Sequence, residues 1–405
     1  MKKGDKTPFS GLGKLFPGGK IRELIDPERV SQIVDLIKKD EDDLESRLNV
    51  LAPDLQIKTS ILVFEILNID KVSGMRLFRW VQSTNNKLHR SADFCALMLC
   101  NCGHLNDYET MGMLLKEFRQ KGFCLSELAF EFLIPLFVSV DSGARESIKH
   151  IVELLRKAGG SCYSSGIHSL IRLLCLLDLF DMAKYVMQIT EMKVAYLNIL
   201  IQEKCKRGLQ EDALGIISEM RGEGCHADTK SYNLILGSLC KMNKLDGAFS
   251  VLKDMKVQGV PADALSYDIL IYFLCKIGKV NDAYRFFNQM VSEGIRPRLL
   301  VHASIIEAFM KVQQCEEAYR YVVDSCVKDP YSSPMIYTFL VKEHRKRGDI
   351  MSAQNIILEM MDKGLRPNYN EYMKVLRSLK GQLATDLKNR YSLFTSSSHT
   401  TSVIR

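Results

Sequence analysis

The sequence predicts an all-α fold, an α-solenoid of stacked helix-turn-helix repeats. Two observations lead to this prediction: four residue types recur along the chain at one spacing of 35, and each block of that length contains two stretches of helical periodicity. A fixed period in this range indicates a stacked array, because one helix pair cannot bury its own apolar face and needs neighbours to complete a core.

Four columns of residues share the spacing of 35 from Val194 onward. Independent columns with one spacing are hard to obtain by chance. Ser325 interrupts the methionine column and Asp329 interrupts the glycine column. The members are Cys205, Cys240 and Cys275; Ala213, Ala248, Ala283, Ala318 and Ala353; Met220, Met255, Met290 and Met360; and Gly224, Gly259, Gly294 and Gly364.

Each block contains two amphipathic helical patterns, which are clearest in the block 229–263. Apolar side chains recur there at three- and four-residue intervals, which places them on one helix face. Gly259 follows the second pattern, where glycine can adopt the left-handed conformation that closes a helix. The small Ala248 lets the two helices approach closely. The apolar residues are Tyr232, Ile235, Leu236 and Leu239, then Val251, Leu252 and Met255.

The same frame divides residues 92–368 into about eight repeats. We expect a basic N-terminal segment at 1–25, a helical region at 26–91, a partial repeat or cap at 369–390 and a disordered tail at 391–405. The regular repeats are 194–228, 229–263, 264–298, 299–333 and 334–368, and the looser ones are 92–126, 127–163 and a shortened 164–193.

Charge and cysteine content narrow the functional classes. A net charge of +7 permits contact with phosphates, although a protein-binding surface could carry the same charge. The chain has twelve cysteines and no secretory signal, and it is too large to need disulfide bonds for stability. These features indicate a reducing compartment. No apolar run is long enough to span a bilayer, so we expect no membrane role. The basic, acid-poor first 22 residues are compatible both with an organelle transit peptide and with an unstructured basic terminus.

We expect no enzyme activity, no cofactor and no metal site. Cys95, Cys100, Cys102 and His104 lie close together, but the chain has no Cys-x-x-Cys pair, which favours buried cysteines acting as small apolar side chains. The His-x-Glu and Cys-x-x-Cys motifs of zinc deaminases are absent, as is a phosphate-binding glycine loop. The repeat frame also shows no convincing cluster of carboxylates of the kind that a metal-dependent nuclease needs.

The columns resemble the pentatricopeptide repeat family, in its P-type subclass, over roughly residues 60–380. The resemblance implies a right-handed superhelix whose first helices line its concave surface and bind single-stranded RNA, one base per repeat. The segment Met75–Trp80 resembles the stretch that precedes the repeats in organellar members. The closest matches are Ser231-Tyr232-Asn233-Leu234-Ile235, Leu239-Cys240-Lys241, and Met290 with Gly294-Ile295-Arg296-Pro297.

In this family the fifth and last residues of a repeat resemble a two-letter code for one base. The resemblance implies two adjacent uracils, two unspecified bases and then adenine, in the 5′ to 3′ direction. The pairs that resemble uracil readers are Asn198 with Asp228 and Asn233 with Asp263, and the adenine pair is Thr338 with Asn368. No base is assigned to Asp268 with Arg298, to Ala303 with Ser333, or to His168 with Lys193.

The resemblance also implies that each base is sandwiched between the second residues of neighbouring repeats. Lys230 is unusual in that column, and a phosphate contact is the alternative role for it. The column is Ala195, Lys230, Leu265, Leu300 and Met335.

Other interpretations stay open beside this one. Asn at the start of a helix and Asp before the next are often capping residues, so the code positions have a purely structural alternative. The main functional alternative is a tetratricopeptide-like scaffold that binds proteins, although Trp80 is the chain's single tryptophan and the motif of that family is not seen. We predict a sequence-selective RNA-binding protein that acts in the stability, processing, splicing or translation of organellar RNA. We expect it in the mitochondrion, with the chloroplast as the alternative. The sequence does not identify protein partners.

Overall fold

The computed structural model describes residues 26–138, 143–222 and 224–400, and the regular secondary structure in these ranges is helical, without a strand. The predicted all-α class is therefore confirmed. The basic segment predicted at 1–25 lies outside the described residues. Within the described part of the chain, no helix is both long and apolar enough to cross a membrane. The chain divides into two compact units, Met1–Arg207 with Gly215–His226, and Gly208–Leu214 with Ala227–Arg405.

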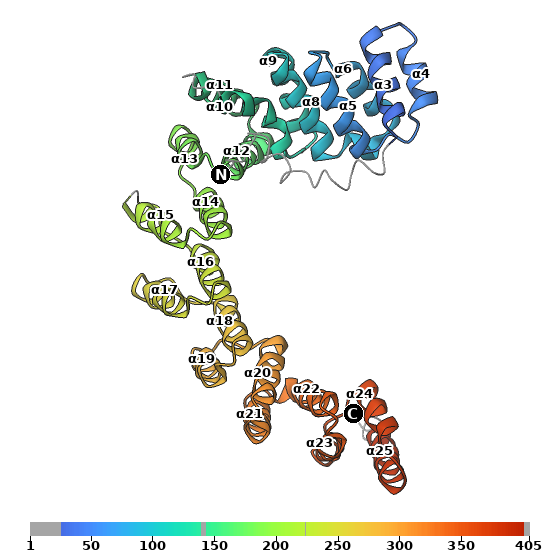
Figure 1. Cartoon of the computed structure of the whole chain (residues 1–405), viewed down its shortest axis with the longest axis vertical. Coiled ribbons are helices and arrows are strands. Elements are labelled where there is room, and N and C mark those ends of the chain that lie inside the picture. The colour runs from blue at the N-terminus through green and yellow to red at the C-terminus, as the bar shows by residue number, and fades with distance from the viewer. Residues whose placement is uncertain (1–25, 139–142, 223, 401–405) are drawn as a thin grey trace, which may run out of the picture. The chain divides into compact units, whose positions relative to one another are not determined.

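The first unit is a stack of helices in which α3, α5, α8, η3, α12 and α14 each pack on the next (Figure 1). This stacking begins at residue 27, well before residue 92, where the sequence frame placed the first repeat. The elements are α3 Pro27–Lys39, α4 Leu44–Leu51, α5 Ile57–Ile69, α6 Met75–Thr84, α7 Asn86–His89, α8 Ala92–His104, α9 Tyr108–Gln120, the 3₁₀ helix η3 Glu127–Leu133, α10 Ile134–Val138, α11 Gly143–Ala158, α12 Gly160–Leu176, α13 Phe180–Ile189 and α14 Val194–Lys206.

The repeat expected at 164–193 differs from the sequence prediction. Its first helix, α12, begins at Gly160 and is 17 residues long, one turn longer than α14. Gly159 and Gly160 have φ angles of 69° and 58°, which only glycine adopts readily, so the chain breaks between α11 and α12 at this pair. The unit is therefore not shortened, because its helix starts directly after the glycine break.

The second unit is a regular series of helix pairs. The first helices α16, α18, α20 and α22 follow one another in a row, and the second helices α17, α19, α21 and α23 all lie on one side of that row (Figure 1). Helices α14, α16, α18 and α20 begin at the residues from which the regular repeats were counted. The elements are α15 Gln210–Gly222 (shared with the first unit), α16 Thr229–Lys241, α17 Leu245–Val257, α18 Ala264–Lys276, α19 Val280–Ser292, α20 Leu299–Lys311, α21 Cys315–Lys328, the 3₁₀ helix η4 Pro330–Ser332, α22 Ser333–Lys346, α23 Ile350–Asp362, α24 Tyr369–Ser378 and α25 Gln382–Thr400.

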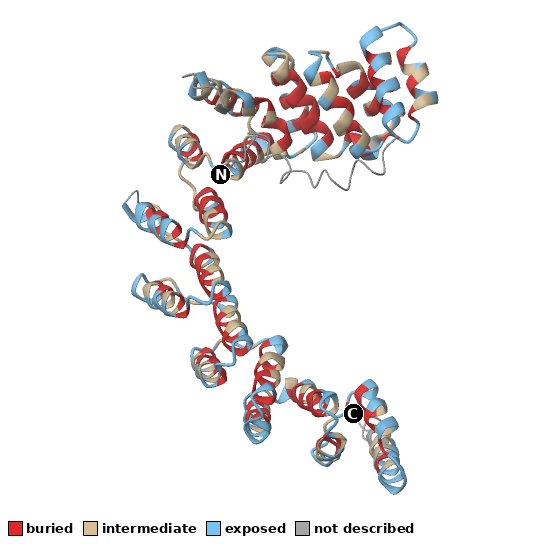
Figure 2. Cartoon of the chain, viewed as in Figure 1, coloured by how far each residue is buried: buried red, intermediate tan, exposed pale blue. Residues whose placement is uncertain are grey.

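The recurring columns form the core and the helix ends of these pairs. The alanine column is fully buried, from Ala213 to Ala353, and the buried faces of the helices turn toward one another (Figure 2). The glycine column closes the second helices: Gly259 and Gly294 have φ angles of 70° and 76°. Asp329 interrupts that column and takes a φ of −135°, so α21 ends differently and continues into η4.

The end of the chain also differs from expectation. We predicted a disordered tail at 391–405, whereas α25 is helical from Gln382 to Thr400. Leu387 is fully buried, and Tyr391 stacks on Tyr372 of α24 with ring centroids 4.0 Å apart. The segment is rich in Ser and Thr, which suggested disorder, but Leu387 and Tyr391 pack α25 against α24.

Candidate nucleic-acid interface

The side of the first helices that faces away from the second helices forms one continuous surface in the second unit. Positions 2, 6, 9 and 13 of each regular repeat are exposed or half-buried there, while most positions between them are buried. These spacings of three and four residues lie on one helix face. We call this surface the open face: Lys230, Leu234, Gly237 and Lys241; Leu265, Ile269, Tyr272 and Lys276; Leu300, Ser304, Glu307 and Lys311; Met335, Phe339, Lys342 and Lys346.

The open face is strongly basic. It carries six lysines, Lys230, Lys241, Lys276, Lys311, Lys342 and Lys346, against one acidic residue, Glu307. Lys241, Lys276, Lys311 and Lys346 end their helices, where a cation also favours the negative end of the helix dipole. Lys311 pairs with Glu307 at 2.7 Å and Lys346 pairs with Glu343 at 2.6 Å, so two of the six lysines are neutralised. The excess of cations suits a ligand with regularly spaced negative charges.

Apolar side chains are exposed at the start of the same face. Leu265, Leu300 and Met335 are 48%, 68% and 39% exposed, although most apolar side chains of their helices are buried. Ala195 and Lys230 are exposed at the same position. Position 13 lies eleven residues further along, for instance Lys241 after Lys230. Eleven residues make about three helical turns, so the lysine lies about 16 Å along the same face. The repeats that begin with α18, α20 and α22 thus offer an apolar contact at one end and a cation at the other, and the repeat that begins with α16 has a lysine at both ends.

The structure brings Asn233 and Asp263 into direct contact. Asn233 Nδ2 donates to Asp263 Oδ1 at 3.0 Å, and Ser266 Oγ lies 2.7 Å from Asn233 Oδ1 and 2.9 Å from Asp263 Oδ1. Asn233 is only 6% exposed, whereas Asp263 is exposed. The buried amide is therefore held in one orientation by Ser266 and by the carboxylate of Asp263, the exposed member of the pair.

Asp263 also begins helix α18. Its side chain accepts the backbone N–H of Ser266 at 2.8 Å, and the Ser266 hydroxyl accepts the Asp263 N–H at 3.1 Å, which is a complete capping box. Burial alone would raise the pKa of Asp263, but the hydrogen bonds from Ser266 and Asn233 outweigh it and hold that pKa below its ordinary value. The carboxylate is charged at neutral pH.

Asp268 and Arg298 form an ion pair, so this code pair too lies together. Burial is the largest effect on Asp268 and raises its pKa, although Arg298 opposes the shift. Asp268 Oδ1 is buried without a hydrogen-bond partner among the described residues. The arrangement gives a physical account of why this pair resembles no standard reader: its two side chains neutralise each other.

The remaining pairs are arranged differently. Thr338 Oγ1 donates to Pro334 O at 2.6 Å within its own helix, and Asn368 caps α24 by accepting from Asn370 N and Glu371 N. Within the described part of the chain, no hydrogen bond joins Thr338 to Asn368. Ser333 is buried and donates to main-chain oxygens, and Ala303 has no polar atom to offer. His168 is exposed on α12, and Lys193 forms an ion pair with Glu191.

The capping alternative accounts for only half of the code positions. Asp228, Asp263 and Asn368 are helix caps. Asn198 and Asn233 are not caps, because each is the fifth residue of its helix, and both are buried. Neither residue begins its own helix, although Asn233 hydrogen-bonds the Asp263–Ser266 capping box that begins α18.

The cysteine cluster has the character of a core. Cys95, Cys100 and Cys102 are buried, and burial raises the pKa of Cys95 and Cys102 to about 12. In the periodic column, burial likewise raises the pKa of Cys240 to about 11 and that of Cys275 to about 12. All twelve cysteines are free, and the described residues contain no group of three or more potential ligands that could hold a metal ion.

The sequence analysis missed two parts of this surface. The first is the lysine column, Lys206, Lys241, Lys276, Lys311 and Lys346, which has the same spacing of 35 as the columns that were found. The second is Ser266, whose hydroxyl links both members of a code pair. A search for polar as well as apolar columns would have revealed the lysines, whereas the serine bridge requires two helices to be placed in space.

Comparison with known proteins identifies the repeats. A model of the PPR repeat family matches residues 192–241 and 227–276, and a model of the PPR repeat matches 265–295. No curated protein sequence matches the chain.

Solved structures similar to the chain include the pentatricopeptide repeat protein PPR10 from maize (16% identity, 93% of this chain and 54% of that one, TM-score 0.47). PPR10 in complex with an 18-nucleotide psaJ RNA element is also similar (18% identity, 85% and 57%, TM-score 0.30). The chain thus spans little more than half the length of these proteins.

Proposed function

The chain is a pentatricopeptide repeat protein, by its residues 192–295, and we propose that it binds single-stranded RNA sequence-selectively, one base per repeat, in organellar RNA metabolism. The observation that carries the proposal is the open face, which combines one exposed second residue and one terminal lysine per repeat. A stretched RNA strand presents phosphates and bases in the same alternation, and sequence-tolerant stacking with cationic contacts is the usual basis of single-strand binding.

Base choice in this proposal rests on the polar pairs at the edge of the open face. Asn233 and Asp263 present an oriented amide and carboxylate, and a base edge can be recognised by such a fixed donor and acceptor, directly or through water. We assign uracil to this pair and to Asn198 with Asp228, and adenine to Thr338 with Asn368. The neutralised pair Asp268 and Arg298 and the inward-facing Ser333 are assigned no base.

A protein-binding scaffold is the competing function, and charge distinguishes the two. A surface that captures a peptide is expected to be more apolar or to clamp a carboxylate. The open face has exposed apolar residues at one position, but its lysines continue through every regular repeat of the second unit. That continuity favours a polyanion over a peptide whose charge is confined to one end.

The test is selection from a random single-stranded RNA pool with the full chain, followed by binding measurements on the enriched sequence. We expect enrichment of two uracils, two variable bases and an adenine. Asn233→Ala should weaken binding by roughly 1–3 kcal/mol and relax the preference at one uracil only. Asn281→Ala, at an exposed asparagine on α19 outside the open face, is the matched control. Binding that is non-selective, or equally weakened by both substitutions, would reject the base-reading proposal.

Localisation is part of the same proposal. The organellar members of the family that the sequence resembles, and the basic N-terminal segment, support the mitochondrion, with the chloroplast as the alternative. Fusing the full chain to a fluorescent protein and imaging it against markers of both organelles distinguishes these, and a diffuse cytosolic signal would contradict both.

A further inference from the structure

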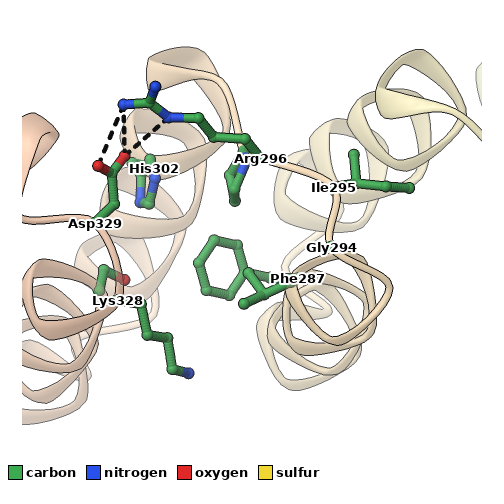
Figure 3. Close-up of a pocket in the computed structure, with 10 residues that line it drawn as sticks. Phe287, Gly294, Ile295, Arg296, His302, Lys328 and Asp329 are labelled. Carbon is green, nitrogen blue, oxygen red and sulfur yellow. Dashed lines mark hydrogen bonds and ion pairs between the residues drawn. The ribbon is translucent and has the colours of Figure 1, made fainter.

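The repeat 299–333 departs from the regular pattern at three positions, and the fold brings all three together. Ser325 stands in the methionine column, Asp329 in the glycine column, and His302 where the two preceding repeats and the following one have Tyr232, Tyr267 and Tyr337. In Figure 3, His302 and Asp329 line one cavity of about 220 Å³, and Ser325 lines it as well. Departures that are scattered in the sequence therefore surround a single pocket.

The equivalent groove one repeat earlier shows what the regular pattern does. There Tyr267 OH donates to Glu293 Oε2 at 2.7 Å, and Pro261 forms part of the wall. Shifting these positions by 35 gives His302, Lys328 and Arg296. A hydroxyl–carboxylate pair is thus replaced by an imidazole and an ammonium, and an arginine is added. The earlier groove, lined by Lys256 and Glu293, carries no net charge, whereas this pocket carries one positive charge.

The buried imidazole lacks a partner on its inner side. His302 is 1% exposed, its Nδ1 lies 2.8 Å from Tyr321 OH, and its Nε2 has no hydrogen-bond partner among the described residues. Its ring packs edge-on against Phe287, with centroids 5.4 Å apart. Burial lowers the pKa of His302 to about 4, so the ring is neutral at physiological pH. In the tautomer in which Tyr321 donates to Nδ1, Nε2 carries the proton and needs an acceptor.

The charged groups around the cavity sum to one positive charge. Arg296 and Asp329 pair across it, with Nη2–Oδ1 3.2 Å, and neutralise each other. Lys328 supplies the excess. Its Nζ lies 3.4 Å from Asn288 Oδ1, and its side chain points away from His302 in Figure 3. An ammonium on four rotatable bonds can turn into the cavity, where it and His302 Nε2 would be two donors without an acceptor.

We propose that this cavity binds a small phosphate-type oxyanion, held by His302 Nε2 and Lys328 Nζ, with the Arg296–Asp329 pair at its mouth. An oxyanion supplies acceptors to both donors at once and matches the single positive charge. The site lies in the groove between α19, α20 and α21 and uses no residue of the open face. It is therefore a second site, separate from the proposed RNA surface.

The test is calorimetric titration of the full chain with sodium phosphate at constant ionic strength and without RNA. We expect one saturable site. The double substitution His302→Tyr and Lys328→Glu restores the arrangement of the neighbouring groove and should weaken binding at least tenfold. Lys253→Glu, an exposed lysine on α17, makes the same charge change as Lys328→Glu and should leave the affinity within twofold.

Two further measurements make the outcome decisive. Lys328→Gln keeps the size of the side chain and should also weaken binding, so the test does not depend on the folding of the double variant. Titration with a nucleoside 5′-monophosphate distinguishes sources: tighter binding than phosphate identifies a phosphate monoester, and equal or weaker binding identifies the free ion. Absence of a saturable site, or equal affinity in wild type and double variant, would overturn the proposal whatever the result for RNA.

Discussion

Replacing Asp263 tests the dual role assigned to this residue. Asp263→Ala removes the cap of α18, which is worth about 1 kcal/mol. It also removes the acceptor of Asn233 Nδ2, 3.0 Å away, and leaves a nearly buried amide donor unpaired, which costs about 1 kcal/mol more. We therefore expect a loss of about 2 kcal/mol. Asp263→Ser keeps a capping hydroxyl but is too short to reach Asn233, so we expect a loss of about 1 kcal/mol.

Hydrogen exchange measured by mass spectrometry is the suitable assay, because a stack of repeats opens locally and a single unfolding free energy is not well defined for it. A loss of about 2 kcal/mol should accelerate exchange in α16 and α18 by roughly 30-fold, and the serine variant by roughly 5-fold. Peptides from α3 and α5 in the first unit serve as the internal control. Equal exchange in the alanine and serine variants would refute the contribution of Asn233, and wild-type exchange in both would refute the capping box.

Three further predictions concern packing, charge and binding. A Cβ at Gly103 would lie 2.3 Å from the Phe132 ring, so Gly103→Ala should destabilise the first unit by about 2 kcal/mol. A Cβ at Gly112 would lie 3.8 Å from Leu154, so Gly112→Ala should stabilise α9 by about 0.5 kcal/mol. Thermal melts in which Gly103→Ala is the more stable variant would contradict this packing. Burial, assisted by Glu65, raises the pKa of Glu131 from 4.5 to about 7. The stability that Glu131 contributes is therefore complete below pH 4.5 and is lost as the pH rises to about 7. In Glu131→Gln the denaturation midpoint should depend less on pH across that range. A variant with the same dependence of midpoint on pH as the wild type would contradict the raised pKa. Replacing Lys241 by Gln should weaken RNA binding uniformly across sequences and reduce the slope of log K against log salt by about one, and a sequence-dependent loss would argue against a phosphate contact.

The periodic part of the fold could be predicted because its determinants are local. Alanine at the helix contact and glycine at φ near +70° recur at fixed offsets, so helix starts such as Thr229 and Ala264 follow from counting. The irregular part could not. Gly159 and Gly160 separate α11 from α12. The 35-residue frame placed no repeat boundary at this pair, because the alanine and glycine columns have no clear members there.

The candidate site was only partly predictable for a related reason. The code positions followed from the resemblance to the pentatricopeptide repeat family, and Asn233 does contact Asp263. The interactions that occupy the side chains depend on neighbouring helices: the ion pair of Asp268 with Arg298 and the bridge from Ser266 appear only when two repeats are placed together. The cavity beside His302 required comparison of spatial neighbours one repeat apart, because its residues extend from Phe287 to Asp329, 42 positions along the chain.

The capping role of the last residue in a repeat limits how such a protein can change its target. Asp228, Asp263 and Asn368 each start the next helix with the same side chain that is proposed to read a base. A mutation that alters the base preference at this position also alters the start of a helix, and only Asp, Asn, Ser, Thr and, more weakly, Gly start helices well. At these three positions, substitutions that keep the cap are therefore limited to a few residue types, whereas Arg298, which precedes α20 without a side-chain cap hydrogen bond, is under no such restriction.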